Sequence, residues 1–561
     1  MNINRILASG MQLVRGRRFR TFEAICQDPL PAQEALLKGL VATHGRTAHA
    51  RRLGVPTSSA ADIAAFRASV PLTSYDDIAP EVEAALHGAP DQLAPGKPIF
   101  FAMTSGTSGA RKLIPLTEDY RRSFQKPMHL FIHSLQKAHP DLFKHRVLYV
   151  VGTPTVEIAP TGVPIGYISG FNYVRMPPLL QRFYAVPPAV FSISDPDANS
   201  YAIARTALMH DLSFAVGITT APFASIARTL ERHQDSLLRD IRDGTLTPPG
   251  TLTPNERRSL AGAFAPDPKR ARVLEQRTKG EDFAPYACWP ELDVVSCWYH
   301  AAAGSAKAAI DDHWRPKSLR SALYSATEGW LNVPLRDNDP SGVAAIDSVF
   351  FEFETLDAAG EPTGETCLIH EVEVGRHYGI VMTTPVGLWR YRLMDEIKVT
   401  GFFGRTPEFH FVQKVGAVLS AHHDLTSGHH FEQAFEALFT ASPKLAGARW
   451  LVWPEEPDAS GRGRYGAAIA SLVGLDAALC DQASELLDAT LAEANPIYGK
   501  ERRSDLLGPV ELQLVSPAAM DAWEEERARL SPAGNQAKPV RLIKDAANVP
   551  AAFRAALRGP V

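Results

Sequence analysis

The part of this sequence best suited to binding chemistry is a loop of five small residues, Ser105, Gly106, Thr107, Ser108 and Gly109. An apolar segment at residues 99–103, typical of a buried strand, precedes the loop, and the basic residues Arg111 and Lys112 follow it. Glycines let the backbone fold tightly around an anion, hydroxyl and free N–H groups donate to its oxygens, and Lys112 supplies compensating charge. These residues indicate a phosphate-binding loop, and a plain flexible turn is an equal alternative from these residues alone. The segment is not a Walker loop, because that motif requires a glycine where Arg111 stands.

A second candidate site lies at residues 324–330, where a carboxylate stands beside hydroxyl groups in what looks like a strand-to-loop junction. Thr327 and Glu328 suit Mg²⁺ carried on phosphates, because Mg²⁺ usually takes one or two protein carboxylates together with phosphate oxygens. The alternative is that both residues cap a helix, and this is the simpler interpretation of the cluster taken alone.

A third candidate is Asp395, the acid at the end of a hairpin-like segment at residues 381–395. A carboxylate that accepts hydrogen bonds from two vicinal hydroxyls is the usual way in which proteins hold a ribose. An acid after a strand is common, so Asp395 alone is a weak indication of a nucleotide site.

Length and composition favour a two-domain enzyme without a charged macromolecular partner. A chain of 561 residues exceeds the size at which one hydrophobic core stops growing. Its formal net charge of -4 gives no reason to expect nucleic acid or a membrane surface as a partner. Five widely spaced cysteines fit reduced thiols in a cytoplasmic protein, and no apolar run is long enough to span a bilayer. The arginine-rich N-terminus is predicted to form the first helix of the fold rather than a transit peptide.

The order of helical and strand-like segments predicts an α/β fold with a largely parallel sheet. Strands are expected at residues 146–152, 212–219, 344–356 and 371–384, and helices at residues 201–209, 222–233 and 431–438. Ser74 is expected to cap a helix, and residues 242–281 are expected to form exposed helices and loops. A hinge is expected around residues 413–419.

The three clusters, in this order, resemble those of the acyl-acid amido synthetases of the auxin-responsive Gretchen Hagen family, which belong to the adenylate-forming superfamily. Residues 397–402 continue the third cluster in the same way. Further segments resemble that family at residues 70–77, 289–295, 350–353 and 535–541. The resemblance extends from about residue 20 to residue 545, which is nearly the whole chain.

The resemblance implies an α/β adenylate-forming fold with two domains. A large N-terminal domain at residues 1–412 would bind ATP and the acyl acid, and a small mobile C-terminal domain would occupy residues 413–561. Such enzymes use ATP and Mg²⁺ to convert a carboxylic acid into an acyl-adenylate, and the amine of an amino acid then attacks it to give an amide and AMP. The expected partners are therefore small molecules, and a monomer is the simplest expectation.

Two alternatives to this activity remain open. An acyl-CoA synthetase would form the same adenylate and pass the acyl group to a thiol. A non-catalytic member of the fold would bind nucleotide or acid without turnover.

The resemblance also implies which residues hold the nucleotide. Residues 105–109 with Lys112 would cover the β- and γ-phosphates of ATP. Tyr324 would lie near the adenine, and Asp395 would accept hydrogen bonds from the ribose hydroxyls.

Three further residues are implied in the chemical step. Thr327 would donate to the α-phosphate, and Glu328 would hold Mg²⁺. Lys538 would be the lysine of the small domain that meets the α-phosphate and the carboxylate during adenylation, a task that suits a compact charge on a flexible stem.

The sequence departs from the family pattern near these residues. The acid of the third cluster usually follows a glycine in the family, whereas Asp395 follows Met394. Near the hinge the family often has Asp-Lys-Thr, whereas this chain has Leu425 between Asp424 and Thr426, so a cation near the nucleotide is missing unless another residue replaces it. The phosphate loop is also one residue shorter than in the common plant form.

Two histidine pairs and one cysteine are interpreted as structural. A metal site needs three or four converging ligands, and adjacent side chains on one element point in different directions. This argues against a metal at His422, His423, His429 and His430. Cys297 and His300 could suggest a thiol nucleophile, but they follow a segment that resembles a family strand, so packing beside the acyl pocket is preferred.

Overall fold

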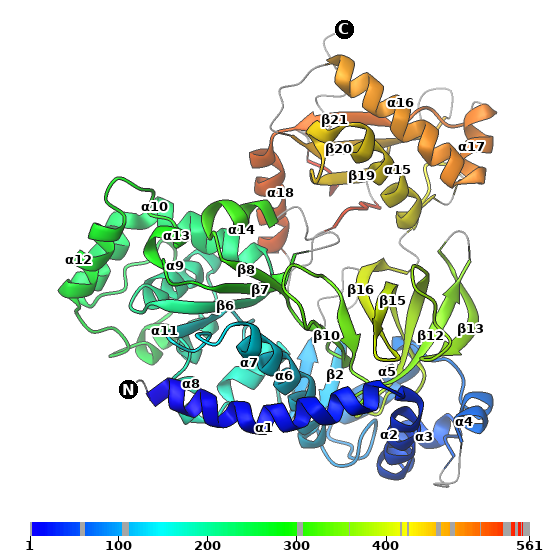
Figure 1. Cartoon of the computed structure of the whole chain (residues 1–561), viewed down its shortest axis with the longest axis horizontal. Coiled ribbons are helices and arrows are strands. Elements are labelled where there is room, and N and C mark those ends of the chain that lie inside the picture. Colours follow the sequence, from blue (N-terminus) through cyan, green and yellow to red (C-terminus); the bar gives the residue numbers. More distant parts are fainter. Residues whose placement is uncertain are drawn as a thin grey trace.

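The computed structural model describes the chain except for residues 1–2, 57–61, 104–111, 300–306, 358–359, 416–417, 423, 425, 456–461, 472–476, 505, 531–539, 545–547, 551–552 and 554–561. Two large groups of strands lie side by side, and the C-terminal elements lie above them in Figure 1. The fold is therefore a mixture of helices and strands, as the sequence predicts.

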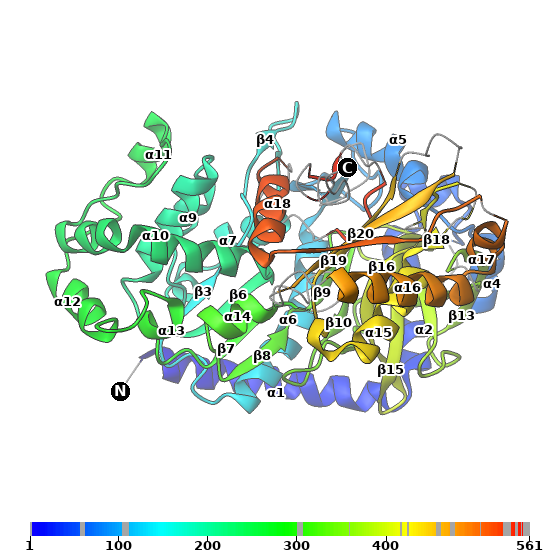
Figure 2. The ribbon, with the colours of Figure 1, turned by 90° about the horizontal axis from the view of Figure 1, so that it is seen from above.

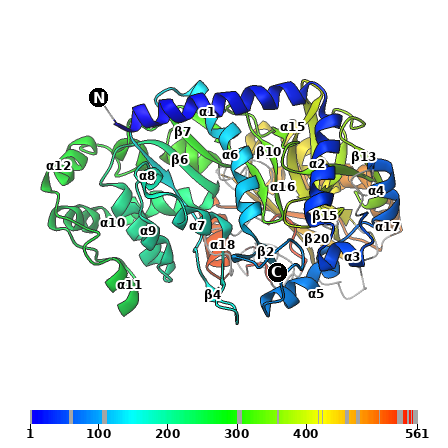
Figure 3. The same cartoon turned by 90° about the horizontal axis from the view of Figure 1, so that it is seen from below.

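Helices of the N-terminal segment cover one side of the molecule. The predicted first helix is confirmed as α1 (Ile3–Cys26), which crosses most of the width of the molecule in Figure 3 and packs against α6 (Glu118–Ala138). Ser74 is confirmed as the N-cap of α5 (Tyr75–Leu86), because its backbone N–H and its hydroxyl donate to the Asp77 carboxylate at 2.7 and 2.9 Å. The other helices of this segment are α2 (Pro29–His44), α3 (Ala48–Arg52) and α4 (Ile63–Ser69).

One four-stranded sheet is wholly parallel and matches the predicted alternation of strands and helices. Its strand order is β3-β6-β7-β8, and each neighbouring pair runs parallel. The strand predicted at residues 212–219 is confirmed as β6 (Leu212–Thr219), and residues 146–152 contain the shorter β3 (Arg146–Tyr149). The other two strands are β7 (Val294–Trp298) and β8 (Ser318–Ser321). Helices surround this sheet in Figure 2, which explains the nearly continuous apolar character of its strands.

The helices around the parallel sheet agree with the predicted ones and are longer. The helices predicted at residues 201–209 and 222–233 lie within α9 (Pro196–Ala207) and α10 (Ala221–Asp243), except for the two residues after Ala207. Residues 242–281 form short helices joined by loops, as predicted. The remaining helices here are α7 (Ile168–Val174), α8 (Pro178–Gln181), η1 (Pro188–Ser192), α11 (Pro254–Ser259), α12 (Pro268–Arg277), α13 (Pro285–Cys288) and α14 (Lys307–His313).

The largest sheet is antiparallel, so the prediction of a largely parallel sheet is wrong for this part of the chain. Its order is β13-β12-β14-β15-β16-β11-β10-β9. No helix separates its strands along the described chain, and a short connection can join only antiparallel neighbours. Its strands are β9 (Tyr324–Ala326), β10 (Gly329–Val333), β11 (Gly342–Ala344), β12 (Phe350–Leu356), β13 (Pro362–Leu368), β14 (His377–Thr383), β15 (Tyr391–Phe403) and β16 (Thr406–Lys414).

A small sheet holds the strands on either side of the proposed phosphate loop. Its order is β2-β1-β5-β4, and β1 (Phe100–Met103) is buried along its whole length, as predicted. β2 (Leu113–Leu116) runs antiparallel to β1, with Met103 opposite Leu113. The two residues that bound the loop region therefore lie side by side, at the same end of this pair of strands. The other strands are β4 (Glu157–Ile158) and β5 (Pro164–Gly166).

The C-terminal part has a hydrophobic core of its own, built from residues between Leu419 and Leu542. Its sheet has the order β19-β20-β21, and the predicted helix at residues 431–438 lies within α15 (Gly428–Ala441). β16 continues through Lys414, so the first two residues of the expected hinge belong to a strand. The other elements are β17 (Val418–Leu419), β18 (Thr426–Ser427), η3 (Pro443–Leu445), β19 (Trp450–Glu455), β20 (Arg464–Ala470), α16 (Ala477–Ala494), α17 (Pro496–Arg503), β21 (Glu511–Val515) and α18 (Pro517–Leu530). None of the helices in the described ranges is both long and apolar enough to cross a membrane.

A buried histidine ties the end of α6 to the parallel sheet. His139 Nδ1 lies 3.0 Å from a carboxylate oxygen of Asp293, and Nε2 lies 2.8 Å from one of Asp337. Arg320 on β8 also donates to Asp337, at 2.6 Å. Both ring nitrogens face acceptors, so the geometry suits the imidazolium form. The hydrogen bond to Asp337 raises the pKa of His139 above its usual value, against the opposing effect of burial.

A group whose pKa is raised by folding stabilises the protein fully below its unfolded pKa of ~6.5 and loses that contribution as the pH rises through the folded pKa. We therefore expect His139→Gln to lower the free energy of unfolding at pH 6 by about 1.5 to 3 kcal/mol, the range for hydrogen bonds to charged groups, and by clearly less at pH 9. Urea denaturation at the two pH values measures this. His87→Gln, at an exposed histidine, is the control and should have little effect at either pH. An equal loss at both pH values for His139→Gln would contradict the ionic role.

Candidate active site

The structure brings Tyr324 and Asp395 together, although they are 71 residues apart in the sequence. The Tyr324 hydroxyl donates to Asp395 Oδ2 at 2.6 Å, and Asp395 is only 1% exposed. Burial and the negative charge of Asp395 raise the pKa of Tyr324 well above its usual value, so the phenol remains a donor at neutral pH. A buried carboxylate that already accepts from a phenol is oriented for further donors, because it has about four acceptor positions.

Thr327 and Glu328 form the tight turn between β9 and β10, where Ala326 pairs with Gly329. The alternative that they cap a helix is wrong, because both neighbouring elements are strands. The Thr327 carbonyl accepts from the Tyr120 hydroxyl at 3.3 Å. Glu328 is buried, and its carboxylate accepts a long hydrogen bond of 3.5 Å from the Tyr391 hydroxyl. The acid predicted to hold Mg²⁺ therefore lies beside β15, the strand that carries Asp395.

Lys112 lies over the ring of Tyr75, the first residue of α5, and the charge of Glu328 contributes to raising the pKa of Tyr75, after the larger effect of burial. The Tyr75 hydroxyl accepts from the Leu113 N–H at 2.8 Å and donates to the Leu113 carbonyl at 3.3 Å. The Lys112 ammonium lies 5.2 Å from the centre of the Tyr75 ring, within the range of a cation–π contact. Residues 105–109 and Lys538 lie outside the described residues, so their predicted roles stay predictions.

A bulge in β15 sets the position of Asp395. Arg392 pairs with Val381 and Glu396 with Gly379, so three residues of β15 stand opposite one residue of β14. Met394, in the middle of the bulge, has a φ of 59°, in the left-handed region that favours glycine. A glycine would adopt this conformation easily, whereas Met394 carries a Cβ, so the backbone is strained at this position.

Lys414 is the residue of this site that sequence analysis missed. It ends β16, opposite Asp395, and its ammonium forms an ion pair with Asp395 Oδ1. The side chain is 46% exposed. Burial opposes its charge, but the Asp395 carboxylate and, beyond it, Glu328 raise the pKa of Lys414 overall. The available signal was that Lys414 is the single basic residue in the expected hinge.

An aromatic cluster closes the site toward the parallel sheet. Trp298, at the end of β7, lies 5.2 Å from the Tyr324 ring, edge to face, and 5.5 Å from the Phe411 ring, stacked. The neighbouring Cys297 lies in β7 and packs in the core, and burial raises the pKa of its thiol far above the usual range. A thiolate nucleophile is therefore disfavoured there. His300 lies outside the described residues.

Within the described residues no group of three or more potential metal ligands converges, and His423 and the His429 side chain lie outside them. His430 Nδ1 accepts from the Ser427 N–H at the start of α15. Asp424 is buried and accepts from the backbone N–H groups of Ala421 and His422 at 3.0 and 3.2 Å and from the Tyr465 hydroxyl. These contacts give Asp424 a structural role in the C-terminal part, and Leu425 is outside the described residues.

The strained conformation of Met394 leads to a stability prediction. Left-handed backbone costs a residue with a Cβ about 1–2 kcal/mol, and glycine adds an unfolded-state entropy cost of about 0.5–1 kcal/mol. Met394 is 40% exposed, so its side chain contributes limited packing. We expect Met394→Gly to raise the free energy of unfolding by up to about 1 kcal/mol, whereas Met394→Ala, which keeps the Cβ, should not. Chemical denaturation of both variants tests this, and an equal gain from alanine would refute it.

Comparison with known proteins identifies the family. Residues 18–311 match the GH3 family N-terminal domain, residues 342–414 its central domain and residues 459–547 its C-terminal domain. The chain is 26% identical to the indole-3-acetic acid-amido synthetase GH3.8 of Oryza sativa subsp. indica, over 91% of this chain and 88% of that protein. It is 24% identical to the indole-3-acetic acid-amido synthetase GH3.5 of Arabidopsis thaliana, over 94% and 91%.

Solved structures agree with this match. The structure superposes on the GH3.15 acyl acid amido synthetase with a TM-score of 0.79, at 22% identity and over 96% of this chain and 95% of that one. The TM-score is 0.81, at 21% identity and the same coverage, for GH3.15 in complex with 2,4-DB. The predicted α/β fold with a large N-terminal part and a smaller C-terminal part is confirmed. Because the N-terminal match alone covers more than half of the chain and two further matches follow it in order, this protein belongs to the GH3 family.

Proposed function

We propose that this protein is an ATP-dependent acyl-acid amido synthetase, which activates a carboxylic acid as an acyl-adenylate and joins it to the amine of an amino acid. The observation that carries the proposal is the buried Asp395 carboxylate, held by Tyr324 and Lys414 beside the Glu328 turn. Family membership supports the same ligase chemistry. The relatives named above are indole-3-acetic acid-amido synthetases and an acyl acid amido synthetase.

The reaction has two steps. The carboxylate of the acid attacks the α-phosphorus of ATP, and pyrophosphate leaves. The amine then attacks the acyl carbon, so that a C–N bond forms, the C–O bond to phosphate breaks and AMP leaves. Both steps need reactants held in line and charge stabilised rather than covalent catalysis by the protein.

Asp395 would accept hydrogen bonds from the ribose hydroxyls at the acceptor positions that Tyr324 does not use. Asp395 is nearly inaccessible while Lys414 covers it, so we infer that the partly exposed Lys414 side chain moves aside when nucleotide binds. Lys414 would then supply the cation near the nucleotide that Leu425 cannot supply. Tyr324, within the aromatic cluster of Trp298 and Phe411, would lie near the adenine.

Thr327 would donate to the α-phosphate, and residues 105–109 with Lys112 would cover the outer phosphates. Glu328 fits Mg²⁺ as a single buried carboxylate on a turn, the kind of ligand that Mg²⁺ on phosphates requires from a protein. When bound there, Mg²⁺ would neutralise phosphate charge. Lys538 would contact the α-phosphate during adenylation.

We further propose that residues 1–412 and 413–561 act as two domains, the second closing over the first between the half-reactions. The separate core of the C-terminal part supports the division, whose boundary at residues 412–413 lies two residues before the end of β16. The protein would work as a monomer in the cytoplasm on small molecules. The free cysteines at all five positions support a reducing compartment.

A matrix of carboxylic acids and amino acids tests the function. With ATP and Mg²⁺, at least one acid should release pyrophosphate, and adding the correct amino acid should give the amide, identified by mass spectrometry. EDTA should abolish both signals. A thioester formed with coenzyme A and no amide would favour an acyl-CoA synthetase. No pyrophosphate release with any acid would favour a non-catalytic binding protein.

Asp395→Asn should reduce the rate of adenylation at least ~100-fold while the protein stays folded. The variant replaces the charged acceptor of the two proposed hydrogen bonds to the ribose, worth about 1.5–3 kcal/mol each, by a neutral amide. ATP–pyrophosphate exchange measures the rate, and circular dichroism checks the fold. Asp240→Asn is the matched control, since buried Asp240 also accepts from a tyrosine, Tyr201, at 2.8 Å, but within the core beside the parallel sheet. Similar losses of exchange in both variants would mean that Asp395 serves the fold and not the nucleotide.

A further inference from the structure

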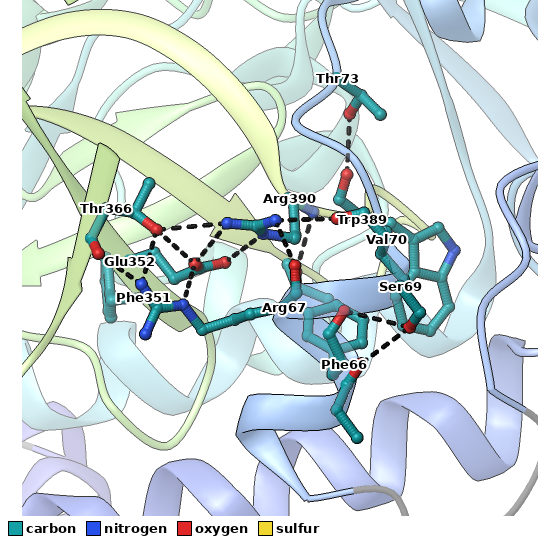
Figure 4. Close-up of polar contacts among 12 residues, drawn as sticks. Phe66, Arg67, Ser69, Val70, Thr73, Phe351, Glu352, Thr366, Trp389 and Arg390 are labelled. Carbon is teal, nitrogen blue, oxygen red and sulfur yellow. Dashed lines mark hydrogen bonds and ion pairs between the residues drawn. The ribbon is translucent and has the colours of Figure 1, made fainter. Parts of the chain in front are cut away.

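Arg390 is a buried arginine directly before the strand that carries Asp395, and it touches none of the residues assigned to the substrates. Its side chain is 8% exposed, and its φ is 44°. Its guanidinium binds Glu352 of β12 through two parallel hydrogen bonds, from Nε to Oε2 and from Nη2 to Oε1, both 2.9 Å long (Figure 4). This bidentate geometry fixes the orientation of both side chains.

The remaining donors of Arg390 bind the end of α4, the residue directly after it and β13. Nη1 donates to the carbonyls of Arg67 at 2.9 Å and Val70 at 2.8 Å, and Nη2 donates to the Thr366 hydroxyl at 3.2 Å (Figure 4). With the two bonds to Glu352, all five N–H groups of the guanidinium are used. Arg390 therefore holds backbone in place and does more than neutralise a buried acid.

The backbone that Arg390 holds leads to the proposed phosphate loop. Three residues after Val70, Thr73 pairs with β15: its N–H donates to the Arg390 carbonyl at 3.0 Å, and its hydroxyl donates to the Trp389 carbonyl at 2.7 Å. Two residues further, Tyr75 binds both backbone groups of Leu113, at the end of that loop.

The other direction along the chain leads to the proposed nucleotide residues. Tyr391, next to Arg390, contacts Glu328, and Asp395 follows four residues later. The segment after α4 and the strand β15 thus meet at Arg390. A shift of one relative to the other would move the phosphate side of the site against its ribose side.

We propose that Arg390 is a positioning residue that sets the distance between the phosphate-binding and the ribose-binding sides of the nucleotide site. The proposal rests on the proposed function. Lysine cannot replace Arg390, because an ammonium has three donors and no planar fork to reach the carboxylate and both carbonyls at once.

Arg67 provides the matched control. It donates to the same Glu352 carboxylate at 3.0 Å and to the same Thr366 hydroxyl at 3.0 Å (Figure 4). The bonds to the backbone carbonyls of residues 67 and 70 come from the Arg390 side chain and not from the Arg67 side chain. A purely structural role in neutralising Glu352 would therefore make Arg67→Lys and Arg390→Lys behave alike.

The test compares the two variants by urea denaturation, by calorimetric ATP binding and by the KM values for ATP and for the acid in pyrophosphate exchange. We expect Arg390→Lys to weaken ATP binding and raise the KM for ATP by between about tenfold and 100-fold, as for a small misplacement of binding groups, with the KM for the acid within twofold. Arg67→Lys should leave ATP binding within twofold, even where its loss of stability is similar.

A second variant keeps the test decisive if Arg390→Lys does not fold. Thr73→Val has nearly the same shape and removes the hydrogen bond to the Trp389 carbonyl, so it should also weaken ATP binding. Equal effects of Arg390→Lys and Arg67→Lys, or unchanged ATP binding in Arg390→Lys or Thr73→Val, would overturn the proposal. Wild-type protein that binds ATP without turnover would refute the proposed function and leave the binding comparison to decide on Arg390. Wild-type protein that binds no ATP would overturn both.

Discussion

The buried carboxylate of Glu352 is the constraint on which the arrangement of the large N-terminal part depends. Removing a charge from water costs several kcal/mol unless it is paired and hydrogen-bonded. Glu352 is paired with Arg390 and Arg67, and it accepts a hydrogen bond of 2.8 Å from the Thr366 hydroxyl. The two arginines come from segments more than 300 residues apart, so the acid can be satisfied only when the end of α4, the strand β12 and the start of β15 meet. This cluster of charged groups therefore favours the arrangement in which these distant segments pack together.

Two different sheets contribute side chains to the candidate site. The parallel sheet brings Trp298 to the end of β7, and the antiparallel sheet brings Tyr324, Phe411 and Asp395 from three of its strands. Ring contacts between Trp298 and both Tyr324 and Phe411 join the two sheets at this place. Arg390 and Met394, both with positive φ, directly precede Tyr391 and Asp395, so strained backbone occurs where the proposed nucleotide site needs side chains in set directions.

Sequence patterns predicted the parts of this structure that depend on local physics. β6, the burial of β1, the N-cap at Ser74 and α15 follow from apolar runs, propensity and capping chemistry. The antiparallel sheet was missed because alternation of strands and helices in the first half of the chain was extended to the second half, where turns replace helices. The proximity of Tyr324 and Asp395 followed from resemblance and could not follow from spacing. Lys414 was missed because its role arises from strand pairing with Asp395, which no local pattern encodes.

The segment at residues 541–543 is bound firmly to the sheet of the C-terminal part. Arg541, three residues after Lys538, donates to Glu432 of α15 at 2.8 Å and lies over the Trp450 ring at 4.8 Å. Its carbonyl accepts from Val452, and the Ile543 N–H donates to the Val452 carbonyl, so this segment is fixed to the edge of β19. A movement of residues 541–543 would therefore be a movement of the small sheet to which they are bound. The ion pair between Arg228 of α10 and Glu525 of α18, 2.6 Å long, links that unit to the large part in this arrangement. Because both partners are partly exposed, the pair adds little stability, so this contact would oppose the proposed domain movement only weakly.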